Sequence, residues 1–211
     1  MNPSQGPTNP SKASVRADAN RRRILEVALA ELLQDPDASM DQIARAAGVV
    51  RRTVYGHFPS REALVGALVD EAMTAVLDAH HAGAEGVDDP AESLARSVLA
   101  VWEVADRYRL LLSLARRSVT VEGLHARLAP VRAAGAAVIR RGQEQGAFQS
   151  PVPAEALSHV CDHVMLGLMD AVNAGDLARE EAGRAAAVTF LTAAGLPASE
   201  ATRLVARITS Q

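Results

Sequence analysis

The stretch SMDQIARAAGVVRRTVYGHFPSR, residues 39–61, decides the fold of the N-terminal part of this 211-residue chain. Ser39 followed three residues later by Gln42 is a capping box, because each side chain can bond a free backbone N–H in the first helical turn. Gly48 supplies the left-handed conformation that ends a helix. A second short helix follows and must stop before Pro59. The stretch therefore predicts two short helices joined by a glycine turn.

The second short helix is predicted to have one apolar face and one basic face. At 100° per residue, the inner face holds Val50, Val54, His57 and Phe58. The outer face and its flanks carry the hydrogen-bond donors Arg51, Arg52, Thr53 and Tyr55. Such donors suit base edges in a major groove or phosphate oxygens. The alternative is an ordinary helical hairpin whose arginines are merely solvated, and we favour a helix-turn-helix that binds DNA.

Three consecutive arginines, Arg21, Arg22 and Arg23, open the preceding helix. The helix macrodipole disfavours positive charge at that end, so an outside partner is expected. A DNA phosphate would serve, and screening by solvent is the alternative. The core side of this helix is predicted to be Leu25, Ala28, Leu29 and Leu32.

The string TVYGHFPSREAL, residues 53–64, resembles the tetracycline-repressor (TetR) family of bacterial transcription regulators. The resemblance is sharpest over residues 23–68. It implies that Thr53, Tyr55 and His57 contact DNA phosphates and that Arg61 grips the DNA backbone from the next helix. It also implies that Arg51 and Arg52 lie nearest the bases.

Two positions depart from the family pattern. Val50 stands where the family often has a small polar residue, which leaves the reading helix without a side-chain N-cap. Arg52 stands where glycine, proline or alanine is common, which adds a long donor to the reading face. The operator sequence therefore does not follow by analogy.

The charge distribution favours DNA on one part of the chain only. The whole chain has a net charge of −3, but residues 1–62 hold nine Lys and Arg against seven Asp and Glu. Residues 63–211 hold thirteen against eighteen, so the negative charge lies in the larger, C-terminal part.

Composition predicts an all-α protein. Hydrophobic residues make up 48% of the chain and aromatic residues only 3%, which favours packed helices over sheets. No apolar run reaches the roughly 20 residues of a membrane span, and no secretory signal is evident. The single cysteine, Cys161, excludes an internal disulfide framework. We expect a cytoplasmic protein without a cofactor, and no catalytic constellation is recognisable.

The expected organisation has three parts: a disordered arm over residues 1–16, a three-helix DNA-binding domain over 17–65, and a larger helical ligand-binding and dimerisation domain over 66–211. Helices are predicted over 60–80, from 90 to about 105, and over 107–118, 121–145, 153–173, 179–194 and 198–209. Leu64, Leu68, Ala72 and Val76 recur at four-residue steps as the core stripe of the first of these.

Small residues line a face of two C-terminal helices, and small side chains let helices approach closely. The resemblance implies that these penultimate long helices form the dimer interface. The interface set is Val160, Val164, Gly167, Leu168, Ala171, Gly183, Ala186, Ala187 and Phe190. Burial inside one protomer is the alternative.

A ligand cavity is the other expected feature of the C-terminal part. The candidate effector-binding residues are Trp102, Tyr108, Arg109, Met165 and Met169. Core filling is an equally good explanation of the apolar ones. His159 and His163 share a helical face and could hold zinc or copper, but the sequence shows no third ligand, so no metal site is predicted.

Together these features predict a homodimeric transcriptional regulator, a repressor released from a palindromic double-stranded DNA operator by a small-molecule effector. One alternative is a helical ligand- or metal-sensing protein whose N-terminal unit makes protein contacts. Another is an enzyme on a helical bundle, which has little support in the sequence.

Overall fold

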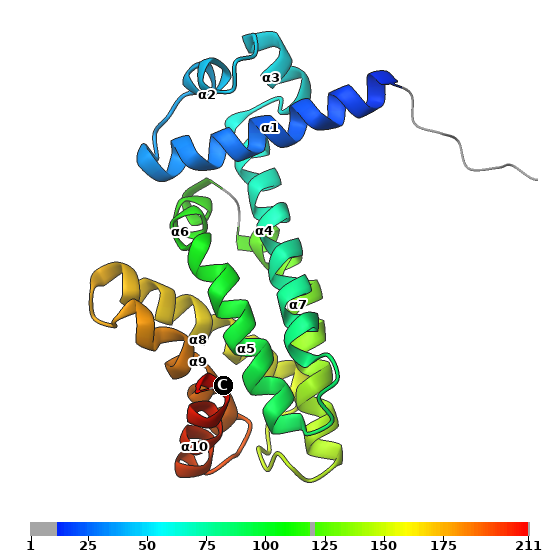
Figure 1. The fold of residues 1–211 in the computed structure, drawn as a ribbon, viewed down its shortest axis with the longest axis vertical. Helices are drawn as coiled ribbons and strands as arrows, with labels where there is room; N and C mark the ends of the chain where they lie inside the picture. The colour runs from blue at the N-terminus through cyan, green and yellow to red at the C-terminus, as the bar shows by residue number, and fades with distance from the viewer. Residues whose placement is uncertain (1–11, 119–120, 211) are drawn as a thin grey trace, which may run out of the picture. The chain divides into compact units, whose positions relative to one another are not determined.

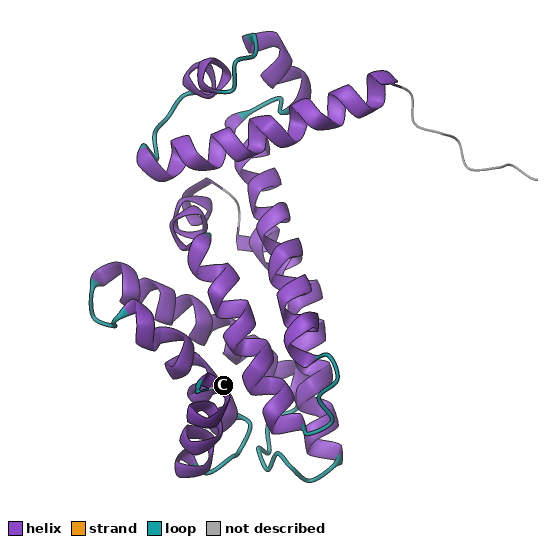
Figure 2. Cartoon of the chain, viewed as in Figure 1, coloured by secondary structure: helices purple, strands orange, loops and turns teal. Residues whose placement is uncertain are grey.

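The computed structural model describes residues 12–118 and 121–210, and this part of the chain is helical with no strand (Figures 1 and 2). The helices in order are α1 (Lys12–Gln34), α2 (Met40–Ala46), α3 (Arg51–His57), α4 (Arg61–Ala84), α5 (Pro90–Arg107), α6 (Arg109–Ser118), α7 (Val121–Glu144), α8 (Ala154–Ala174), α9 (Arg179–Ala193) and α10 (Ala198–Thr209). The all-α prediction is confirmed, and apart from the start of α1 the predicted helices agree with these bounds to within a few residues.

The chain divides into two units, Met1–Leu68 and Val69–Gln211, which we call the N-terminal and C-terminal units. The division falls inside α4, three residues beyond the predicted boundary at residue 65. Helix α1 begins at Lys12, so residues 12–16 are helical although we expected a disordered arm there. The rest of that predicted arm, residues 1–11, lies outside the described residues.

The N-terminal unit is built on local signals that the sequence carries. The Ser39 capping box is present, with Gln42 N donating to Ser39 Oγ at 3.3 Å and Ser39 N donating to Gln42 Oε1 at 2.8 Å. Its core is formed by the large side chains Ile24, Leu25, Ile43, Val54, Phe58 and Leu64. Burial of these side chains fixes α3 against α1 and α2, because each apolar face is removed from water only in this arrangement.

The C-terminal unit is organised around α5. Asp89 caps this helix, with Glu92 N donating to Asp89 Oδ1 at 2.7 Å, and Pro90 occupies its first turn as predicted. Helix α5 packs against α9 and α7, α7 packs against α8, and α10 packs against α9. A Cβ at Gly83 would lie 2.8 Å from the Arg96 carbonyl oxygen, so glycine permits the close approach of α4 to α5.

None of the helices in the described part of the chain has the length and apolar character that a membrane crossing requires.

Candidate nucleic-acid interface and interior cavity

Helices α2 and α3 form a helix-turn-helix. Gly48 adopts φ +66°, and the turn closes with Val49 N donating to the Ala44 carbonyl at 3.0 Å. Ala44 and Val54 are buried where the two helices meet. This packing turns the opposite face of α3 toward solvent.

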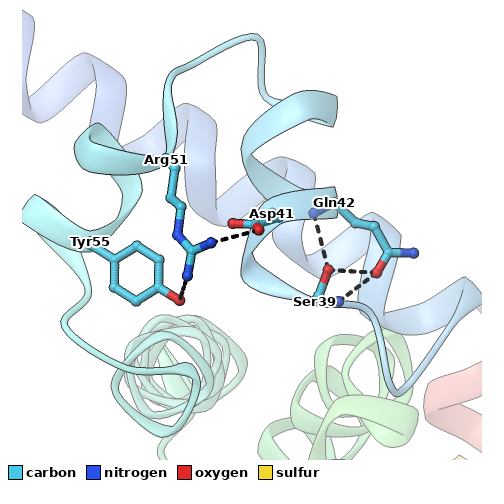
Figure 3. A network of polar contacts seen from close by, with 5 residues as sticks. All are labelled: Ser39, Asp41, Gln42, Arg51 and Tyr55. Carbon is cyan, nitrogen blue, oxygen red and sulfur yellow. Dashed lines mark hydrogen bonds and ion pairs between the residues drawn. The ribbon is translucent and has the colours of Figure 1, made fainter.

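Arg51 is held by two partners on the exposed side of this unit (Figure 3). Its Nη1 donates to Asp41 Oδ2 at 2.8 Å, and its guanidinium carbon lies 5.1 Å from the centre of the Tyr55 ring. Its Nη2 also reaches the Tyr55 hydroxyl at 3.4 Å. Because both side chains of the ion pair are exposed, the pair adds little to stability. Its effect is to orient Arg51 and Tyr55 together.

Arg52 differs from Arg51 in having no such partner. It is exposed on α3, and within residues 12–118 and 121–210 its side chain makes no hydrogen bond, ion pair or ring contact. A long, unpaired guanidinium can bond guanine or phosphate through two parallel hydrogen bonds. Arg52 is therefore the donor on this face that remains available to a ligand.

The remaining predicted contacts on α3 are less exposed. Thr53 and His57 are half-buried, and His57 lies beside Phe58 with ring centres 6.2 Å apart. Val50, which we placed on the inner face, is instead 67% exposed at the start of α3. It caps the helix without a side-chain hydrogen bond, as expected for a residue with no polar group.

The three consecutive arginines of α1, Arg21, Arg22 and Arg23, are all exposed. The Arg21 guanidinium stacks 5.3 Å from the centre of the Phe58 ring. Arg23 Nη2 lies 3.3 Å from the position that a Cβ on Gly48 would occupy, so it sits beside the turn of the helix-turn-helix. Arg21, Arg22 and Arg23 do not lie at the start of α1, because that helix begins nine residues before Arg21, at Lys12. The helix dipole therefore gives no reason to expect a partner for their positive charge.

Arg61 is engaged inside the N-terminal unit. Its Nη2 donates to the Pro36 carbonyl, and its Nε lies 3.5 Å from the Ala38 carbonyl oxygen. These bonds tie the start of α4 to the loop between α1 and α2. These bonds give Arg61 a structural role in that loop, and its contact with the DNA backbone stays a prediction.

Gly56 lies on the exposed side of α3 with open space around it. A Cβ there would meet nothing within 4 Å. Gly56→Ala should therefore raise the free energy of unfolding by about 0.5–1 kcal/mol, since alanine loses less backbone entropy in a helix. If a DNA backbone approaches α3 at this point, the same change weakens DNA binding. Urea unfolding measures the stability of the variant, and titration of the same sample with DNA measures its binding. Improved stability with unchanged DNA binding would show that the DNA backbone does not come close to α3 at Gly56.

The C-terminal unit encloses a cavity of about 90 Å³. Most of its walls are aliphatic side chains and methionines, contributed by α4, α5, α7, α8 and α9. Met165 and Met169, two of the predicted effector-binding residues, line it. The cavity also contacts His80, Ser158, Cys161 and Asp162.

The other three predicted effector-binding residues lie outside this cavity's lining. Trp102 packs against Gly183, where an added Cβ would lie 3.0 Å from the indole. Tyr108 follows the last turn of α5, and Arg109 is bonded to Asp106 and Asn173. Aromatic character and charge suggested these residues, but their orientation is set by helix packing.

The predicted dimer residues divide into two groups. Those on α8 reach the surface in part, with Val160 51% exposed and Gly167 free of neighbours within 4 Å of an added Cβ. Ala186 and Ala187 on α9 are fully buried, and Gly183 packs on Trp102. Phe190 lines the cavity. On α9, Ala186 and Ala187 are thus buried inside one protomer, as the alternative expected, whereas Gly183 and Phe190 are half-buried.

The histidine pair on α8 has no third metal ligand beside it in the part of the chain that the structure describes. Within the described residues, no group of three or more His, Cys, Asp or Glu side chains is placed to hold a metal ion. His159 Nε2 lies 3.2 Å from Arg132 Nη1, and His163 Nδ1 lies 2.9 Å from the His159 carbonyl oxygen. Both rings are thus occupied by neighbours on α7 and α8.

Burial raises the pKa of the Cys161 thiol to about 12, and the nearby Asp162 carboxylate adds to the effect. Because the thiolate is the reactive form, Cys161 should be nearly inert in the folded chain. We expect iodoacetamide at pH 8 to modify it roughly a thousandfold more slowly than in urea, where the pKa returns to about 8.5. Intact-mass spectrometry measures this directly, since the chain has one cysteine. Comparable rates in both states would show that the cavity opens readily.

His80 is a cavity residue that we did not predict from the sequence. It is 7% exposed and lines the cavity. The sequence did contain the signal, because His80 continues the four-residue stripe of Leu64, Leu68, Ala72 and Val76. We ended that stripe at its last aliphatic member.

Comparison with known proteins agrees with the helix-turn-helix. Residues 24–68 match the family described as bacterial regulatory proteins, tetR family. The HTH-type transcriptional repressor LfrR of Mycolicibacterium smegmatis is 43% identical over 61 residues, which cover 29% of this chain and 32% of LfrR. The chain thus spans about a third of the length of the curated relatives it matches.

Solved structures extend the likeness in fold to most of the chain. RolR, crystallised with resorcinol, has a TM-score of 0.67 at 18% identity, covering 92% of this chain and 96% of RolR. The fatty acid degradation regulator FadR of Bacillus halodurans has a TM-score of 0.72 at 17% identity, covering 82% and 94%. Residues 24–68 thus match the tetR family of bacterial regulatory proteins, and most of the chain shares the fold of these two solved structures.

Proposed function

We propose that this protein is a DNA-binding transcriptional regulator of the TetR type, acting in the cytoplasm as a homodimeric repressor. The observation that carries the proposal is the exposed face of α3, where Arg52 is unpaired and Arg51 holds Tyr55 beside it. A helix-turn-helix places such a face in the major groove. The excess of positive charge in residues 1–62 supports the same orientation toward DNA.

In this proposal Arg52 contacts a base edge, whereas Tyr55, Thr53 and the exposed Arg22 contact phosphates. Arg51 acts as a positioning residue through its bonds to Asp41 and Tyr55. A base contact specifies sequence, and phosphate contacts set affinity and register. The proposal therefore assigns specificity mainly to one side chain per protomer.

The exposed part of α8 is the proposed dimer interface, through Val160, Val164, Gly167, Leu168 and Ala171. Val160 is an exposed apolar side chain, and the open space at Gly167 leaves room for a partner helix. Two-fold symmetry then makes the operator a palindrome, with half-sites about one helical turn, or a multiple of it, apart.

The cavity is the proposed effector site. RolR, a structural neighbour, was crystallised with resorcinol, which supports a small-molecule role for this fold. Helix α4 is continuous from Arg61 to Ala84, so it connects residues of the N-terminal unit with Met73, Val76 and His80 in the cavity wall. An effector that binds more tightly to one conformation of α4 shifts the population toward that conformation. If the effector binds the conformation that does not fit the operator about 3 kcal/mol more tightly, operator binding weakens more than a hundredfold.

The test is selection of duplexes from a random pool by the full-length protein, followed by fluorescence anisotropy over a range of salt concentrations. We expect a palindromic consensus and a linear fall of log K with log salt, because phosphate contacts release counterions. A folded sample that binds no duplex even in dilute buffer would overturn the proposal. In that case the N-terminal unit makes protein contacts instead.

A further inference from the structure

Among the nitrogen- and oxygen-bearing side chains that line the cavity, His80 is the one not already engaged within the described residues. Ser158 Oγ donates to the Arg132 carbonyl at 2.9 Å, and Asp162 Oδ2 accepts from Arg132 Nε at 2.8 Å. Both ring nitrogens of His80 are buried, and neither has a hydrogen-bond partner within the described part of the chain. His80 is therefore the polar wall group still open to a ligand.

Burial lowers the pKa of His80, and the electrostatic effect of neighbouring His81 lowers it further, so the uncharged imidazole is favoured. A neutral imidazole has one nitrogen that donates and one that accepts a hydrogen bond. It can therefore accept from a hydroxyl or donate to a carbonyl, but it offers no charge to neutralise an anion.

We propose that the cavity binds a small, uncharged and largely apolar molecule whose single hydroxyl or carbonyl group hydrogen-bonds to His80. Burying His80 without a partner is unfavourable, and such a ligand supplies the missing bond. The aliphatic walls, among them Val76, Leu94, Val98 and Ile139, take the apolar remainder. That this ligand acts as an effector rests on the proposed function, whereas its binding does not.

The walls argue against a charged ligand. An unpaired charge in an apolar interior is strongly unfavourable, and the wall's one ion pair already balances Asp162 with Arg132. A carboxylate or an ammonium ion would have no free counter-charge there. The preference for uncharged molecules therefore follows from both the apolar walls and the neutral histidine.

The size of the cavity limits the ligand to few heavy atoms. Its volume is about 90 Å³, whereas an engineered cavity of about 150 Å³ holds benzene. An aromatic ring therefore fits only if wall side chains move. Met73, Met165 and Met169 line the cavity, and unbranched thioethers adapt their shape at low cost.

His80 also connects the cavity to the packing of α4 on α5. Ser97 Oγ on α5 donates to the His80 carbonyl at 3.2 Å, one turn from the close approach at Gly83. A ligand bonded to His80 thus acts on a residue that α4 and α5 share. Through this residue, a ligand bound in the cavity would affect the packing of α4.

The experiment compares phenol, toluene and benzoate by isothermal titration calorimetry on the full-length chain, without DNA. Phenol and toluene have similar size and differ in the hydroxyl. We expect benzoate not to bind. We expect His80→Leu to weaken phenol about tenfold relative to toluene, the effect of one hydrogen bond (about 1.4 kcal/mol).

His81→Leu is the matched control, since His81 is exposed and is not part of the cavity wall. It should leave the phenol-to-toluene ratio unchanged. His80→Gln retains a donor and an acceptor and should keep most of the preference, which provides a second variant if His80→Leu does not fold.

An unchanged ratio in folded His80→Leu, loss of preference in His81→Leu, or benzoate binding as tightly as phenol would overturn the proposal. Absence of binding by phenol and toluene to the wild-type chain would overturn it as well. DNA titrations of the same samples separate the two ideas. Intact operator binding with no ligand preference refutes only the His80 site, and ligand binding without DNA binding refutes only the regulator.

Discussion

Arg52→Ala should lower affinity for the selected DNA by roughly tenfold to a hundredfold per half-site, because a bidentate arginine–base contact contributes about 1–3 kcal/mol of discrimination. A dimer bound to a palindrome would lose this affinity at both half-sites. Discrimination should also relax at one base position of each half-site. Repeating the duplex selection with the variant measures this, since the consensus loses information at that position.

Two other variants provide the contrast for Arg52. Tyr55→Ala should weaken all duplexes to a similar degree, because it removes a phosphate contact and the ring that holds Arg51. Arg22→Ala should do the same and lower the salt slope by about one per protomer. If Arg52→Ala instead weakens every duplex equally, Arg52 contacts phosphate and the assignment of base reading to it is wrong.

Gly195→Ala should lower the free energy of unfolding of the C-terminal unit by about 3 kcal/mol or more. Gly195 adopts φ +104°, which alone costs a residue with a side chain about 1–3 kcal/mol. An added Cβ would also lie 2.5 Å from the Ser150 nitrogen, so the backbone after α9 must shift. That shift strains the bond from Ser150 N to the Ala194 carbonyl, now 3.0 Å.

Gly175→Ala separates the effect of the positive φ from the effect of the steric clash. Gly175 also has a positive φ, +82°, but an added Cβ there meets nothing within 4 Å. We expect a loss of only about 1 kcal/mol from the backbone conformation. Urea unfolding followed by Trp102 fluorescence reports on the correct unit, because Trp102 is the single tryptophan and is buried there. Equal losses in both variants would refute the steric argument.

Local signals in the sequence were sufficient to predict most helix boundaries. Ser39 with Gln42, Asp89 with Pro90, and Gly175 all begin or end helices where their chemistry requires. These signals act within one turn of the chain, so they do not depend on distant residues. The same holds for the four-residue stripe that buries Leu64, Leu68, Ala72 and Val76.

Roles that depend on a neighbour from another helix were not predictable. The sequence presents Arg51 and Arg52 as equivalent cations. In the structure Arg51 pairs with Asp41 and Arg61 bonds the carbonyls of Pro36 and Ala38, whereas Arg52 has no partner among the described residues. A guanidinium takes whichever acceptor the packing brings within reach, and that distance is not encoded by spacing along one helix.

The sequence by itself determined the helical class, the helix-turn-helix and the likeness to TetR regulators, because capping, periodicity and turn chemistry are local properties of the chain. Only the tertiary structure decided that Ala186 and Ala187 are interior, that Trp102 packs on Gly183, and that the His80 ring lines an apolar cavity without a hydrogen-bond partner among the described residues. Small and amphipathic side chains suit a core, a cavity wall and a subunit interface equally well. The choice among these is made by which helices pack together, and that choice minimises exposed apolar area over the whole unit rather than along any one segment.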